Sequence, residues 1–97
     1  MTAKGMVLTD LEYNALNKIA SASKLDCWFS IDTVFGVDYV YDIASGKRFS
    51  MRRGVSILFS EMVFEPDDPF YGLTGDEVFA FKRLLVKLGI ASKKAER

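Results

Sequence analysis

The stretch Leu8-Thr9-Asp10-Leu11-Glu12 contains a capping box, the clearest local structural signal in this chain. In such a box the threonine hydroxyl accepts a hydrogen bond from the N–H of the glutamate three residues later, whose carboxylate accepts one from the threonine N–H. A helix is therefore expected to begin at Thr9 and to end near residues 21–24. The same box recurs at Thr74-Gly75-Asp76-Glu77 and predicts a later helix, with Gly89 suited to the left-handed position at its end.

Another helix is predicted between these two, over residues 51–63. Its apolar side chains recur at helical spacing after Ser50, which is a suitable N-cap. Gly54 and two arginines in the first turn weaken this prediction, because glycine disfavours a helix interior and positive charge disfavours a helix N-terminus.

Residues 26–43 are predicted to form a β-hairpin, because β-branched and aromatic side chains alternate with aspartates along residues 37–43. A three-residue loop, Val34-Phe35-Gly36, places one apolar set of side chains on the core face. That set consists of Cys27, Phe29, Ile31, Tyr39, Tyr41 and Ile43. A short third strand is expected around Arg48-Phe49, after a turn at Ser45-Gly46.

The predicted fold class is therefore α+β: an N-terminal helix, a small antiparallel β-hairpin or three-stranded meander, and then two helices packed on the sheet. With 97 residues, of which 49% are hydrophobic, the chain is long enough for one hydrophobic core. We expect a single globular domain over residues 1–97, with flexible ends at residues 1–7 and 92–97.

The residue types that are missing restrict the chemistry. The chain contains no histidine and a single cysteine, Cys27, which we expect in the core. Without histidine it lacks the usual base at neutral pH and the commonest transition-metal ligand, and one cysteine forms no intrachain disulfide. No phosphate-binding glycine motif is present. We therefore predict no catalytic residue, no cofactor and no metal site, in a cytoplasmic protein that enters no membrane.

Three aspartates form a candidate site on the outer face of the predicted hairpin. In the expected register Asp32 lies opposite Asp38, with Asp42 and Trp28 farther along that face. A solvated surface is the simplest interpretation. The alternatives are contact with a basic partner, a divalent cation, or carboxylates that share a proton, which is the arrangement of an enzyme using only aspartates. Trp28 is the preferred anchor for a partner.

The densest basic cluster consists of Lys47, Arg48, Arg52 and Arg53. These side chains are expected either to pair with nearby carboxylates or to bind phosphate groups or an acidic protein surface. The formal net charge of 0 argues against a general attraction of the whole chain to nucleic acid.

These features favour a small intracellular protein-binding or accessory module without catalytic activity, which contacts another protein or a second copy of itself as a homodimer. Small phage and mobile-element proteins that bind or inhibit host proteins share this size and this lack of an active site. The alternative is a nucleic-acid-binding or regulatory protein that uses the basic cluster. The candidate partner-binding residues are Trp28, Asp32, Asp38, Asp42, Arg48, Arg52 and Arg53.

Overall fold

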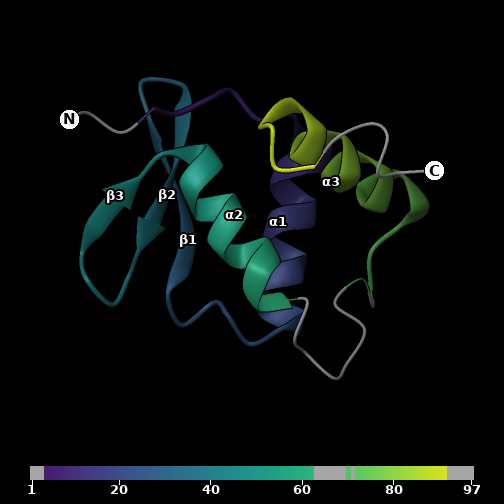
Figure 1. The fold of residues 1–97 in the computed structure, drawn as a ribbon, viewed down its shortest axis with the longest axis horizontal. Helices are drawn as coiled ribbons and strands as arrows, with labels where there is room; N and C mark the ends of the chain where they lie inside the picture. The colour runs from purple at the N-terminus through teal and green to yellow at the C-terminus, as the bar shows by residue number, and fades with distance from the viewer. Residues whose placement is uncertain (1–3, 63–69, 71, 92–97) are drawn as a thin grey trace.

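The computed structural model describes residues 4–62, 70 and 72–91, and it confirms the predicted α+β fold in the predicted order (Figure 1). The predicted flexible end at 92–97 lies outside the described residues. The elements are α1 (Asp10–Ala22), β1 (Phe29–Val34), β2 (Val37–Asp42), β3 (Lys47–Phe49), α2 (Met51–Met62) and α3 (Gly75–Lys87).

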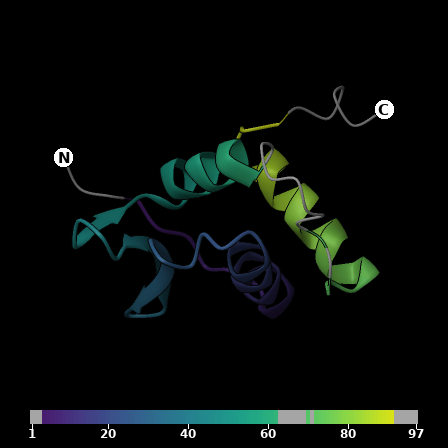
Figure 2. The same cartoon turned by 90° about the horizontal axis from the view of Figure 1, so that it is seen from below.

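The three strands form an antiparallel sheet in the order β1-β2-β3, and helices cover one of its faces. Phe29 and Val40 point from this inner face into the core, where they join buried side chains of α1 and α2. α3 packs against α1 on the far side from the sheet (Figure 2). The core therefore lies between the sheet, α1, α2 and α3, and the opposite sheet face carries no helix in the described part of the chain.

Both predicted capping boxes are confirmed. In α1 the Thr9 N–H donates to Glu12 Oε1 at 2.9 Å, and the Glu12 N–H donates to Thr9 Oγ1 at 3.2 Å. Thr74 and Glu77 repeat both bonds at the start of α3. The end of α3 is also as predicted, because Gly89 has a left-handed φ of 74° and the next residue returns a hydrogen bond to the last turn.

Gly54, which weakened the prediction of α2, permits a close approach between this helix and the sheet. A Cβ atom at Gly54 would lie 2.3 Å from side-chain atoms of Val40, which is fully buried in β2. The glycine lowers intrinsic helix stability but lets the α2 backbone rest directly on the central strand. Ser50 accepts a hydrogen bond from the Arg53 N–H and so acts at the helix start as predicted.

The predicted hairpin register is wrong by one residue. Val34 pairs with Val37, so the loop consists only of Phe35 and Gly36. Both loop residues have positive φ, 52° and 78°, which is the type I′ turn whose twist matches that of the flanking strands. Because side chains alternate along a strand, this shift reverses the face of every β2 side chain, and Val40 points inward in place of Tyr39.

The expectation of a buried Cys27 is also wrong. Residues 26–28 form a turn between α1 and β1 rather than the start of the strand, and Cys27 is exposed. At the other end of the hairpin, Met6 exchanges two backbone hydrogen bonds with Asp38. Residues 4–7, part of the segment predicted as a flexible end, are thus attached to β2 through Met6.

Candidate functional site

The uncovered side of the sheet is the first candidate surface. The strand pairing places its side chains on alternate positions of each strand. We call this set the outer sheet face, and it consists of Ser30, Asp32, Val34, Val37, Tyr39, Tyr41 and Arg48.

An ion pair spans the middle of the outer sheet face. Arg48 on β3 reaches across β2 to Asp32 on β1, where its Nε and a terminal nitrogen both donate to Oδ2 at 3.2 and 2.9 Å. The guanidinium also lies over the Tyr39 ring, 5.0 Å from its centroid. Both charged side chains remain partly exposed, so the pair contributes little to stability and stays accessible to another molecule.

Exposed apolar side chains lie at the tip of the hairpin and toward its other end. Phe35 at the hairpin tip is 100% exposed, and Ile43 and Tyr41 are 50% and 36% exposed. The sequence-based site omitted all three. Gly36 marks a turn, but Phe-Gly is not among the dipeptides that signal a two-residue loop, so the outward position of the tyrosines had no clear local signal.

Trp28 does not occupy the predicted position on the outer face. It is half-buried against the core, with its ring edge-on to that of Phe29 and the two ring centroids 5.4 Å apart. Its Nε1 donates a hydrogen bond to Oε2 of Glu61 in α2 at 2.9 Å. The prediction failed because it extended the strand alternation through Trp28, whereas this residue belongs to the preceding turn. Trp28 therefore links β1 to the end of α2 instead of presenting a free anchor.

The structure also separates the three aspartates. Asp32 pairs with Tyr39, and Asp38 pairs with Thr33 on the inner face. Buried Asp38 accepts hydrogen bonds from the Leu8 N–H at 3.1 Å and from the Thr33 hydroxyl. It therefore shares neither a face nor a proton with Asp32, and the predicted opposition of these two carboxylates is wrong.

Asp42 closes the turn between β2 and β3. Its carboxylate accepts from the Ala44 N–H at 3.0 Å and from the Ser45 hydroxyl at 2.9 Å. This is the local role in which aspartate commonly stabilises a turn. Asp42 is thus placed away from the outer face expected from the sequence.

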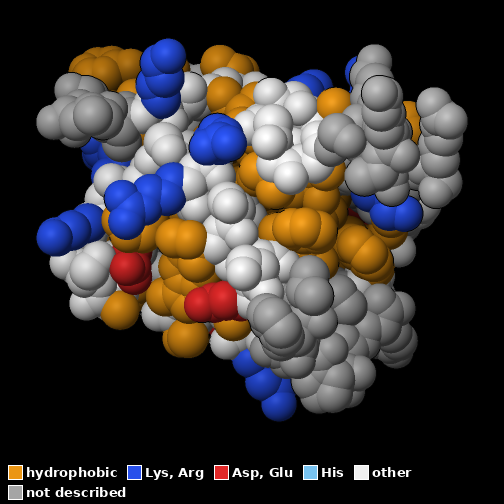
Figure 3. Space-filling view, in the orientation of Figure 1, with side chains coloured by type: hydrophobic (Ala, Val, Ile, Leu, Met, Phe, Trp, Pro, Cys, Tyr) orange, Lys and Arg blue, Asp and Glu red, His pale blue; other side chains and the backbone are white. Residues whose placement is uncertain are grey.

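The remaining two arginines of the predicted site make separate contacts. Arg52 donates from Nε to the Leu88 carbonyl at the end of α3, at 2.8 Å, and Arg53 lies over the Phe49 ring at 4.7 Å. Neither lies on the outer sheet face. Figure 3 nevertheless shows Lys and Arg side chains gathered on one side of the molecule, over β3 and the start of α2.

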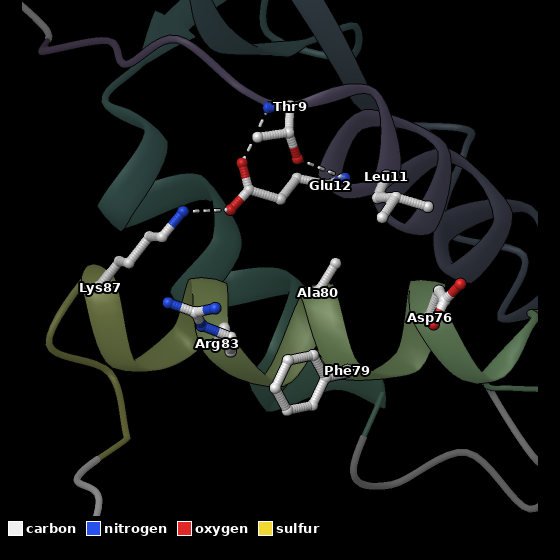
Figure 4. Close-up of a pocket in the computed structure, with 8 residues that line it drawn as sticks. All are labelled: Thr9, Leu11, Glu12, Asp76, Phe79, Ala80, Arg83 and Lys87. Carbon is white, nitrogen blue, oxygen red and sulfur yellow. Dashed lines mark hydrogen bonds and ion pairs between the residues drawn. The ribbon is translucent and has the colours of Figure 1, made fainter.

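A second candidate surface is a shallow hollow of ≈ 290 Å³ between α1 and α3 (Figure 4). It is bordered by exposed Leu11 and Phe79 and closed at one end by an ion pair between Lys87 and buried Glu12, 2.8 Å apart. Burial raises the pKa of Glu12, but hydrogen bonds from Lys87 and the Thr9 N–H outweigh this and hold it below its usual value of 4.5.

The start of α3 repeats this arrangement in the opposite direction. Glu77 accepts from Lys18 of α1 at 2.9 Å, and this hydrogen bond, followed by that from the Thr74 N–H, lowers the pKa of the Glu77 carboxyl. Each capping-box glutamate therefore accepts one hydrogen bond from the N-cap of its own helix and one from a lysine of the other helix. Glu12 uses both carboxylate oxygens in these contacts, whereas Glu77 accepts both of its hydrogen bonds on Oε1.

No known family model, curated protein or solved structure matches this chain, so function is inferred from its own residues. Across the described ranges, no group of three Asp, Glu or Cys side chains is arranged to hold a metal ion. None of the helices within those ranges combines the length and the apolar character needed to cross a bilayer.

Proposed function

We propose that this protein is a protein-binding module that contacts its partner through the hairpin tip and the outer sheet face. The observation that carries this proposal is Phe35. Its ring is 100% exposed and so contributes no burial to the fold, yet its backbone is held at φ 52°. The left-handed region costs a residue other than glycine about 1–2 kcal/mol. Because Phe35 keeps this costly conformation without contributing burial to the fold, we infer that it has a role in function.

The surroundings of Phe35 are typical of an interaction surface. Exposed Ile43 and Tyr41 add apolar area, and Arg48 and Tyr39 are held in place by their mutual contact and by Asp32. Aromatic and arginine side chains supply much of the binding energy in protein interfaces. Phe35, the two tyrosines and Arg48 are side chains of these types.

The proposal is tested by placing a photoreactive phenylalanine analogue at position 35 in the full chain and irradiating cells of the native host. The matched control carries the same analogue at Tyr13, an aromatic residue on α1 that is 40% exposed. We expect a discrete protein adduct from position 35 and none of that mass from position 13. Equal adducts from both positions, or none from position 35, would contradict the proposal.

A nuclease-sensitive adduct at position 35 would instead favour the nucleic-acid alternative. Salt dependence then provides the check, because phosphate contacts weaken steeply as salt rises. The basic side chains over β3 and α2 are the structural reason to include this measurement.

Phe35→Asn separates binding from folding. Asparagine tolerates the left-handed position in an Asn-Gly turn, so we expect the free energy of unfolding to rise by about 1 kcal/mol while binding to the crosslinked protein weakens at least about tenfold. Lys24→Gly is the control, because Lys24 has a similar φ of 59° at the end of α1, far from the hairpin tip in sequence. It should stabilise the chain and leave binding unchanged. A Phe35→Asn variant that binds normally contradicts the role of Phe35.

A further inference from the structure

The free edge of β1 offers unpaired backbone groups. Ile43 donates to the Trp28 carbonyl at 2.8 Å, which sets the alternation of hydrogen bonds between β1 and β2. By this alternation the backbone N–H and C=O groups of Ser30 and Asp32 form hydrogen bonds with β2. Those of Ile31 and Thr33 point away from β2, toward the open edge. Neither Ile31 nor Thr33 makes another backbone hydrogen bond within the described part of the chain.

The two edges of the sheet differ in how well they are protected. β3 is only three residues long, contains Lys47 and Arg48, and is followed along the same side of β2 by the bridge from Met6. β1 has six residues in continuous register, without proline, glycine, lysine or a bulge, and its one charged side chain is Asp32. Charged side chains, short strands and bulges are the features that normally prevent strand addition, so the β1 edge is the one open to it.

A hollow beside this edge has an acidic wall. It measures ≈ 160 Å³ and is lined by Ser30, Ile31, Asp32 and Tyr41. Arg48 binds only Oδ2 of Asp32, so Oδ1 has no hydrogen-bond partner among the described residues. A side chain from a strand placed next to β1 would reach this hollow, since directly opposed side chains lie about 5 Å apart.

The carboxylate beside this edge favours a cationic occupant. Asp32 lines the hollow with one oxygen left free by Arg48, whereas Asp38 and Asp42 use their carboxylates on the inner face and in a turn. We propose that β1 accepts an extended segment of a partner protein as an additional strand, with a lysine or arginine of that segment bound at Asp32. This inference rests on the proposed protein-binding function and specifies how the partner is recognised: backbone hydrogen bonds at Ile31 and Thr33, and one cationic side chain in the hollow.

A second copy of the chain fits this edge less well. Antiparallel pairing of two β1 strands about Ile31 would bring the two Asp32 residues to neighbouring diagonal positions on one face. Like charges in neighbouring positions oppose this pairing, whereas a basic strand is attracted to it.

The test measures amide hydrogen exchange by NMR on the full-length protein in the presence of two synthetic seven-residue peptides. Both alternate valine with a charged residue and have threonine ends, and they differ only in carrying lysine or glutamate. With the lysine peptide at millimolar concentration we expect exchange at Ile31 and Thr33 to slow by about tenfold, as for a ligand at roughly ten times its Kd. The glutamate peptide should leave both amides unprotected.

Two variants and one control examine the recognition elements. Asp32→Asn should reduce the difference between the peptides to less than about twofold, whereas Asp26→Asn, which removes an exposed carboxylate in the preceding turn, should retain the difference. A chain with N-methylated Ile31, assembled by chemical ligation at Cys27, lacks the outward N–H donor and should lose protection at Thr33. Strand edges tolerate the loss of an outward donor, and a thermal melt verifies that each variant is folded.

The inference is overturned if the lysine peptide protects neither amide, or if both peptides protect equally. It is also overturned if protection rises with protein concentration in the absence of peptide, because that result identifies a second copy as the occupant. Crosslinking through position 35 without any edge protection rejects strand addition but leaves the proposed interaction surface intact.

Discussion

The helix pair α1 and α3 and the hairpin β1–β2 show two different ways in which sequence determines structure. Each helix begins at a box whose hydrogen bonds join residues three apart, so a few neighbouring residues define the helix start. The hairpin instead depends on whether its loop contains two or three residues, and this choice determines which side chains are buried. Local hydrogen bonding thus fixes the helix starts, whereas packing against distant elements selects the face of the strand.

The largest effect is expected where the hairpin meets α2. Gly54→Ala places a methyl group 2.3 Å from the fully buried Val40 side chain, so we expect the free energy of unfolding to fall by about 3 kcal/mol. Urea unfolding measures this loss of stability. Gly75→Ala is the control, because no atom lies within 4 Å of its added Cβ atom, and it should be neutral or stabilising. Equal effects of the two substitutions would contradict the close approach of α2 to β2.

The hairpin register is tested by the same substitution on opposite faces. Val40→Thr buries a hydroxyl group on the inner face and should lower the free energy of unfolding by about 2 kcal/mol. Val34→Thr lies on the outer sheet face and should change it by less than about 0.5 kcal/mol. A larger loss of stability from Val34→Thr than from Val40→Thr would support the register with a three-residue loop instead.

The helix pair is tested through pH. Because the pKa of Glu12 is lower in the folded chain than its usual value of 4.5, its contribution is present above pH 4.5 and is lost as the pH falls through the folded pKa. Glu12→Gln should lower the free energy of unfolding at pH 7 by about 1 kcal/mol and flatten its decline in acid. Glu77→Gln should flatten it in the same direction. An unchanged slope in both variants would show that these carboxylates do not link the helices.

The smallest effect is expected at Cys27, in the turn that precedes β1. Its exposed thiol should react with a thiol reagent in the native state about as fast as in urea, and Cys27→Ser should change the free energy of unfolding by less than about 0.5 kcal/mol. A strongly slowed native reaction would indicate that Cys27 is buried, as expected if β1 began before this residue.

The sequence was sufficient for the order of the elements and for the helix starts, but not for the candidate surface. Val40 and Tyr39 are both apolar enough to face the core, so alternation along β2 fits either face. Which face of β2 is buried depends on Gly54, which lies in α2 and makes room for Val40. Phe35 lies in the loop of either register but was not considered as a contact residue, and Trp28 was misplaced because its turn was taken as strand.

The reciprocal contacts of Glu12 and Glu77 have a consequence for how the chain unfolds. The two lysine contacts join residues separated by 75 and 59 positions, so each helix start is secured by a distant part of the chain. The glutamate in the first turn of each helix binds a lysine of the other helix. Fraying of either first turn therefore breaks this contact and exposes the facing side of the other helix to water. We therefore expect α1 and α3 to melt as one cooperative unit, which joins two segments that the sheet and α2 separate in the sequence.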